Sequence, residues 1–134
     1  MENKLSRFKA REQGFILIFE KIFNEESLDT IIENAEQSRD IVFDSYAKEL
    51  AEGVYSNLEV IDSSISAHLK KGWTIKRISK TGLAIMRLAV YEMKFVDNIP
   101  DGVAINEAVE LAKKYTVDDS KFINGVLGAV SRDK

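Results

Sequence analysis

Ala104-Ile-Asn-Glu-Ala-Val-Glu-Leu-Ala-Lys-Lys-Tyr115 and Lys121-Phe-Ile-Asn-Gly-Val-Leu127 are the two stretches that decide the fold. Apolar residues recur every three or four positions in both, which is the spacing of one face of an α-helix. The segment between them is short and polar, and Thr116 and Asp119 have the spacing of a capping box at the start of the second helix. The pattern therefore predicts a helical hairpin, in which we expect Asn106 and Asn124 to be buried hydrogen-bonding residues rather than ligand contacts.

The rest of the chain has the same helical periodicity and no convincing strand pattern. We expect an all-α fold, a compact bundle of about six or seven helices in two packed lobes. The 134 residues suit a single domain with a real core. The N-terminal lobe would span about 1–71 and the C-terminal lobe about 72–134. The helices expected before the hairpin span about 5–24, 27–38, 43–69 and 80–96, and 73–79 should form a short turn around a buried indole.

The composition excludes several kinds of site. The chain has no cysteine, so it can form neither disulfides nor thiolate metal sites. It also lacks a phosphate-binding Gly-Lys-Ser/Thr loop, a metal-ligand cluster and a nucleophile–base pair, so we expect no enzyme and no cofactor. The apolar run 14–19 is too short to span a membrane and has a glutamate near each end, which is wrong for a signal peptide. We expect a cytoplasmic protein with no membrane partner.

The net charge of -3 conceals strong segregation along the chain. Residues 1–11 have a net charge of +3, residues 20–52 of -7, and residues 70–94 of +6. An acidic protein with such blocks can still present a basic face to a polyanion.

The basic cluster at the N-terminus is the first candidate site. On a helix, Lys4, Arg7 and Arg11 would share one face, with Lys9 beside them. Such a row of cations suits a row of phosphates, because each neutralised phosphate releases condensed counterions. On the residues alone, a solvated helix end is the simpler explanation of the cluster.

The turn before the second hairpin helix is the second candidate site. Lys121 and Phe122 combine a phosphate partner with a stacking surface, and Asp119 lies next to them. The alternative is that Phe122 begins the core face of its helix and Asp119 is only a cap.

The run from Phe15 to Phe19 is apolar at all five positions and covers more than one full helical turn. One core cannot take all five side chains from one side. Either the first helix is buried on both sides by its own fold, or one face of it meets another protein.

The hairpin residues resemble the C-terminal signature of the NusB family of transcription antitermination factors. The resemblance extends to Met86-Arg-Leu-Ala-Val-Tyr-Glu92, to Ile99-Pro100 and to the N-terminal segment 7–12. It implies a NusB-like fold and an RNA-binding transcription antitermination factor. Such a factor binds boxA-type single-stranded RNA together with the ribosomal protein NusE, joins the RNA polymerase antitermination complex, and supports ribosomal RNA transcription. The RNA-binding residues implied or expected are Lys4, Arg7, Lys9, Arg11, Asp119, Lys121 and Phe122.

The resemblance also implies a contact surface for NusE. It would include the first helix, through Phe15 and Phe19, and the start of the helix near residue 80. In that second helix Gly82 occupies the position of a glutamate that helps bind NusE in some relatives, and Met86 and Arg87 follow it. The alternative function is a dimeric helical protein-interaction module with little RNA affinity of its own, in which the first helix forms a homodimer.

Overall fold

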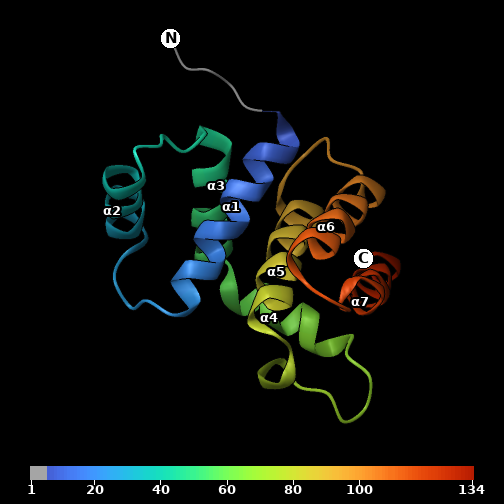
Figure 1. The fold of residues 1–134 in the computed structure, drawn as a ribbon. Helices are drawn as coiled ribbons and strands as arrows, with labels where there is room; N and C mark the ends of the chain where they lie inside the picture. Colours follow the sequence, from blue (N-terminus) through green and yellow to red (C-terminus); the bar gives the residue numbers. More distant parts are fainter. Residues whose placement is uncertain (1–5) are drawn as a thin grey trace.

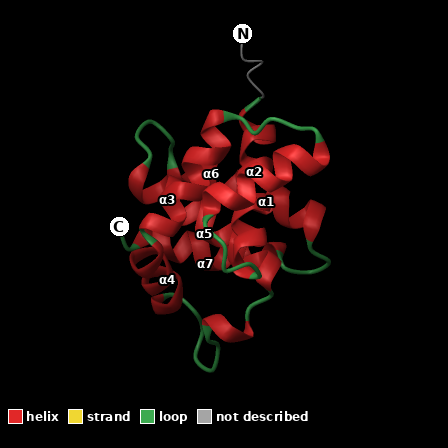
Figure 2. Ribbon diagram, turned by 90° about the vertical axis from the view of Figure 1, so that its left-hand side faces the viewer, coloured by secondary structure: helices red, strands yellow, loops and turns green. Residues whose placement is uncertain are grey.

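The structure is a computed structural model that describes residues 6–134. Seven α-helices and one 3-10 turn account for most of this range, which contains no strand (Figures 1 and 2). The predicted all-α class is confirmed. The division into two lobes near residue 71 stays a prediction. The elements are α1 (Arg7–Ile22), α2 (Leu28–Arg39), α3 (Ser45–Ser56), α4 (Leu58–Ala67), η1 (Ile75–Arg77), α5 (Lys80–Phe95), α6 (Asp101–Tyr115) and α7 (Ser120–Arg132).

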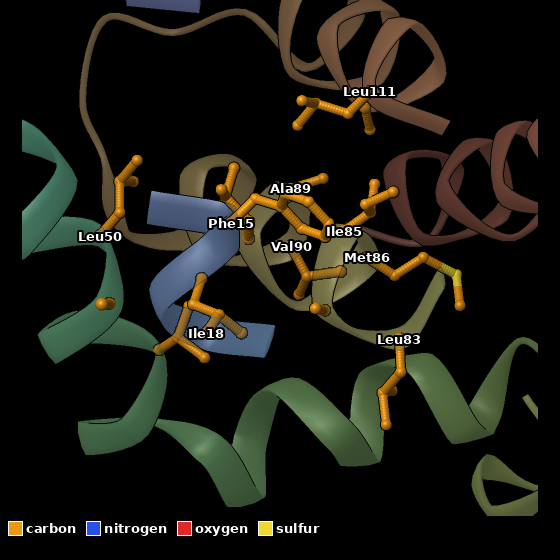
Figure 3. Packing of buried hydrophobic residues seen from close by; sticks show 14 of the residues in the cluster. Phe15, Ile18, Leu50, Leu83, Ile85, Met86, Ala89, Val90 and Leu111 are labelled. Atoms are coloured by element: carbon orange, nitrogen blue, oxygen red, sulfur yellow. The ribbon is translucent and has the colours of Figure 1, made fainter. Parts of the chain in front are cut away.

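Helix α5 lies at the centre of the molecule. It contacts α1, α3 and α4 as well as α6 and α7. Its sequence is apolar nearly all round, which is the pattern of a helix with no solvent face. Leu83, Ile85, Met86 and Val90 are buried in the same hydrophobic cluster as residues of α1, α3 and α6 (Figure 3). No described helix is long and apolar enough to cross a membrane.

Helix α1 is covered on both sides by its own fold. It packs between α3 and α5, and it also contacts α2 (Figure 1). Phe15, Leu17 and Ile18 are buried, whereas Ile16 and Phe19 are only partly so. Of the two explanations for the apolar run 15–19, burial by the chain itself therefore accounts for most of these side chains.

The long helix expected over residues 43–69 is broken at Asn57. The backbone there leaves the helical region (φ -123°, ψ 24°), and the Asn57 side-chain amide donates a hydrogen bond to the Gly53 carbonyl. A side chain that bonds its own backbone competes with helix continuation. The break gives two shorter helices with different neighbours, since α3 packs mainly on α1 whereas α4 packs on α5 and α7.

Candidate nucleic-acid interface

Arg7 and Lys9 lie exposed in the first turn of α1. Ser6 caps this helix, since its side-chain oxygen accepts a hydrogen bond from the Lys9 amide at 3.2 Å. The Arg7 guanidinium carbon lies 3.8 Å from the centre of the Tyr46 ring on α3, which holds the side chain in place by a cation–π contact. Both side chains are exposed to an anion, and Lys9 also pairs with Glu12 at 3.7 Å. Lys4 lies outside the described residues.

Arg11 does not belong to the expected row of exposed cations. Its side chain is only 4% exposed, and its Nε donates to both carboxylate oxygens of Glu92 at 2.9 and 3.0 Å. The Tyr46 hydroxyl donates to the same carboxylate at 2.6 Å. Burial together with this hydrogen bond raises the pKa of Tyr46. One turn further along α1 than Arg7, the same helix face is covered by α3 and α5, so Arg11 neutralises a buried glutamate and presents no charge to RNA.

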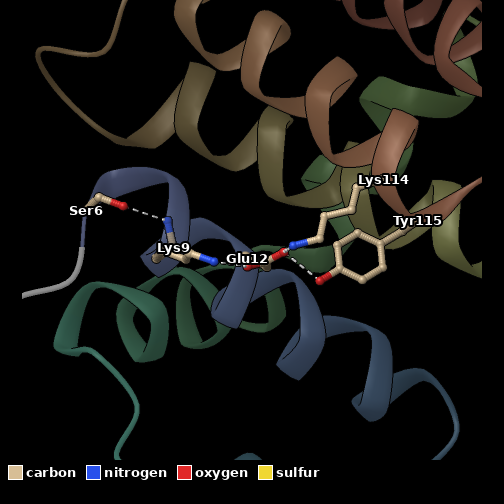
Figure 4. Close-up of polar contacts among 5 residues, drawn as sticks. All are labelled: Ser6, Lys9, Glu12, Lys114 and Tyr115. Carbon is tan, nitrogen blue, oxygen red and sulfur yellow. Dashed lines mark hydrogen bonds and ion pairs between the residues drawn. The ribbon is translucent and has the colours of Figure 1, made fainter.

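Glu12 ties the start of α1 to the end of α6 (Figure 4). Its carboxylate pairs with Lys9 at 3.7 Å, with Lys114, and with the Tyr115 hydroxyl at 2.6 Å. Burial raises the pKa of Glu12, but the hydrogen bonds from Lys114 and Tyr115 outweigh it and lower the pKa overall. Burial and the bond to Glu12 raise the pKa of Tyr115 to about 12. The contact brings the end of α6, and so the turn that follows it, beside the N-terminal cations.

The turn between α6 and α7 is fixed by side-chain hydrogen bonds, and the predicted capping box is only half formed, through the bond from the Asp119 amide to Thr116. Helix α7 begins at Ser120, and the Asp119 carboxylate makes no cap bond to its amides. Instead it accepts a bond from the Ser79 hydroxyl at 2.7 Å, and Ser79 in turn caps α5 at Gly82. Thr116 accepts from the Asp119 amide at 3.3 Å. Asp119 therefore holds the turn against the start of α5.

Lys121 is exposed at the start of α7, and Phe122 is half-buried. The Phe122 ring lies 5.5 Å from that of Trp73, centre to centre. Both readings of Phe122 thus apply in part, because the ring packs on the fold and keeps some exposed surface.

Asn106 and Asn124 are exposed, so the expectation that they are buried is wrong. Both line an open groove of about 490 Å³ between α6 and α7, together with Lys113 and Lys121. The helical spacing predicted the buried positions of this hairpin in part, since Ala108, Ala112, Val126 and Val130 are buried, and the two amides lie outside this face.

Most of the residues expected to bind a partner are buried inside the fold and form no exposed surface. Phe15, Gly82 and Met86 are buried. Arg87 is nearly buried and donates two hydrogen bonds, at 2.8 and 2.9 Å, to the Asp62 carboxylate. A side chain at position 82 would place its Cβ 2.9 Å from the Ser79 hydroxyl oxygen, so the close packing around this cap favours glycine.

Phe19 alone of these residues keeps an exposed part, and it contacts a residue that the sequence analysis missed. Phe23 is 65% exposed, and its ring centre lies 5.1 Å from that of Phe19. The spacing of Phe15, Phe19 and Phe23 at four-residue intervals could have revealed this aromatic row. Among residues 6–134 there is no group of three or more His, Cys, Asp or Glu side chains suited to a metal ion.

Comparisons with known proteins agree with this architecture. The model of the NusB family matches residues 8–132. The transcription antitermination protein NusB of Pediococcus pentosaceus is 43% identical over 134 residues, covering 96% of this chain and 98% of the relative. The T. maritima NusB structure has a TM-score of 0.82 and 34% identity, covering 98% of this chain and 94% of that one. A structure of antitermination factors NusB and NusE in complex with double-stranded RNA has a TM-score of 0.82 and 27% identity, covering 97% of this chain and 100% of the matched one.

Proposed function

The chain belongs to the NusB family, and we propose that it is a transcription antitermination factor that binds boxA-type single-stranded RNA jointly with the ribosomal protein NusE. In this role it joins the RNA polymerase antitermination complex and supports ribosomal RNA transcription. The protein acts by recognition, and no bond is made or broken. The observation that carries the proposal is the family match over nearly the whole chain, to relatives named as antitermination proteins.

The RNA contact that we propose begins at the start of α1 and continues to the α6–α7 turn. Arg7, Lys9 and Lys121 are exposed and can meet phosphates, and Phe122 offers a partly exposed ring. We place Lys4 with them from its position in the sequence. The contacts of Glu12 with Lys9 and Lys114 support this arrangement, since they hold the two halves of the interface side by side.

The roles that we propose for the remaining site residues follow from their burial and their hydrogen bonds. Arg11 and Asp119 support the interface without touching RNA, through Glu92 and Ser79. The partner contact for a NusE-type protein starts from Phe19 and Phe23, because these rings have exposed surface. Phe15 supports this surface through its ring, which lies 6.2 Å from that of Phe19, whereas Met86 and Arg87 act through the packing of α5.

A titration with labelled boxA-type RNA tests the proposal, by fluorescence anisotropy with and without NusE. We expect binding that tightens when NusE is present, and weaker binding of a duplex of the same sequence. The Arg7→Gln, Lys9→Gln double variant should bind the RNA more weakly, while circular dichroism shows unchanged helix content. The matched control is the Lys48→Gln, Lys94→Gln variant, which removes two charges outside the proposed interface.

No RNA binding in either titration would overturn the proposal. If the protein then forms dimers that the Phe23→Asp substitution dissociates, the chain is instead an interaction module that uses the exposed end of α1.

A further inference from the structure

The segment that joins α4 to α5 is strongly basic. We define the basic segment as residues 70–80, which include η1 and contain no acidic residue. Its five cations are all exposed, and none of them forms an ion pair with any described residue. The charge is therefore free to attract an anion. These cations are Lys70, Lys71, Lys76, Arg77 and Lys80.

The same segment exposes the only tryptophan of the chain. Trp73 is 43% exposed, so the expectation of a buried indole is wrong. The segment forms a protruding loop at the end of the molecule opposite the start of α1, where few elements can cover it (Figures 1 and 2). A large aromatic side chain left partly exposed among cations is the usual make-up of a surface that binds nucleic acid.

Trp73 lies next to two other groups that can stack. The Arg77 guanidinium carbon lies 5.2 Å from the centre of the indole, and its Nη1 donates to the Gly72 carbonyl at 2.9 Å. The ring of Phe122, from α7, lies 5.5 Å from the Trp73 ring, centre to centre. The backbone at Gly72 has a φ of +91°, which glycine adopts without strain and which lets the chain turn here. The aromatic pair and its guanidinium are therefore positioned before any ligand arrives.

This group is continuous with the RNA contact proposed above. Phe122 belongs to both, and Lys121 precedes it. The hydrogen bond between Ser79 and Asp119 fixes the basic segment against the α6–α7 turn. A strand that reaches Phe122 would thus meet the Trp73 ring next.

We propose that the basic segment is a second contact surface for single-stranded RNA, in which a base stacks on Trp73 and neighbouring phosphates meet Lys71 and Lys76. The inference rests on the proposed RNA-binding function and extends its site from the start of α1 to the opposite end of the molecule. The chemistry fits single-stranded RNA because an unpaired base exposes its face to an aromatic ring, while its phosphates follow at the spacing of cations.

The single tryptophan makes the test direct. RNA is titrated into the wild-type protein, and anisotropy of the labelled RNA and emission of Trp73 are followed in the same sample. We expect an RNA long enough to cross the molecule to quench the emission with the same midpoint as the anisotropy change. A short RNA that reaches only the N-terminal cations should bind without quenching.

Two sets of variants separate stacking from charge. Trp73→Leu should weaken binding of the long RNA by about 5- to 100-fold, and Trp73→Phe should restore most of it, because every base can stack on a ring. The Lys71→Gln, Lys76→Gln variant should make the slope of log affinity against log salt shallower by about 1.4. The Lys48→Gln, Lys94→Gln variant is the matched control and should keep the wild-type slope.

Each other outcome has a defined meaning. If long RNA binds without quenching the emission of Trp73, and the Lys71→Gln, Lys76→Gln variant keeps the wild-type salt slope, the inference is wrong while the proposed function stands. If the lysine variant keeps its RNA affinity and loses a co-binding protein, the surface belongs to that protein and the inference is again wrong. If no RNA binds by anisotropy, the proposed function fails, and this inference fails with it.

Discussion

Arg11 and the basic segment carry the same kind of charge in opposite settings. The Arg11 guanidinium is buried against Glu92, whereas the five cations of residues 70–80 face solvent and pair with no described carboxylate. A buried pair resists the loss of either partner, because the remaining charge has no water around it. An exposed cation costs little to keep and is free to meet a phosphate. Burial, and not residue type, separates the cations that stabilise this fold from those that can bind RNA.

The largest effect expected from this comparison is on stability. Arg11→Ala leaves Glu92 buried without its charged partner, so the free energy of unfolding should fall by about 3–5 kcal/mol. Urea denaturation measures this loss. Arg7→Ala is the matched control on the same helix and should cost less than about 1 kcal/mol, since it removes only an exposed cation–π contact. Equal stability of the two variants would show that Arg11 is not held in a buried ion pair and is available to an anion.

The aromatic row on α1 extends the comparison to uncharged side chains. Phe15→Ala should lower the free energy of unfolding by about 3–5 kcal/mol, because the ring is only 3% exposed. Phe23→Ala, two helical turns away, should cost less than about 1 kcal/mol and instead weaken binding of a NusE-type partner. Thermal unfolding and a pull-down with NusE measure the two effects. A large stability loss in Phe23→Ala would show that the exposed ring has a structural role.

The paired and unpaired cations can also be compared at the groove between α6 and α7. Lys121→Gln should make the salt slope of RNA binding shallower by about 0.7, which corresponds to one phosphate contact on a single strand. Lys113 lines the same groove but pairs with Glu110 at 3.6 Å, so Lys113→Gln should change the slope less. Anisotropy titrations at several salt concentrations give both slopes. Two equal reductions would mean that the ion pair does not decide which lysine meets RNA.

The smallest effect concerns His68, whose charge depends on pH. Its Nδ1 lies 2.6 Å from the Ser64 carbonyl oxygen and its Nε2 lies 2.7 Å from the Asp133 carboxylate. The Ser64 carbonyl, followed by Asp133, raises the pKa of His68 above its ordinary value of 6.5. Because the folded state binds the proton more tightly, the stabilisation is complete below pH 6.5 and disappears as pH rises through the raised pKa.

The contribution of His68 should be below about 1 kcal/mol, since Asp133 is largely exposed to solvent. Denaturation of the wild type and of His68→Gln between pH 5 and pH 9 measures it. The difference between the two should be greatest at the acidic end and close to zero at the alkaline end. A difference that grows with pH would show that His68 is stabilised in its neutral form.

The sequence predicted the helices better than the fate of their polar side chains. Apolar spacing placed α1, α2, α5 and the α6–α7 hairpin, because burial follows periodicity. It did not reveal the break at Asn57, since a single side chain that bonds the Gly53 carbonyl decides it. The helix bounds therefore followed from local patterns, and the break did not.

The candidate site divides in the same way. Arg7, Lys9 and Lys121 are exposed, as a helical face suggested. The burial of Arg11 depends on Glu92, which is 81 positions away, and no local pattern links the two. The exposure of Trp73 likewise depends on which elements reach the loop between α4 and α5. Long-range packing decides both outcomes, so local sequence patterns could not predict either of them.

The central position of α5 has a consequence for how the chain folds on the ribosome. Helices α1 to α4 are synthesised first, yet part of their apolar surface is covered only by α5, which ends at Phe95. Until that residue has left the exit tunnel, the face around Phe15 and Ile18 has no complete cover. Once α6 and α7 have also packed, no neighbour of α5 can detach without exposing it. We therefore expect one cooperative unfolding transition, with the backbone amides of α5 exchanging their hydrogens only when the whole molecule opens.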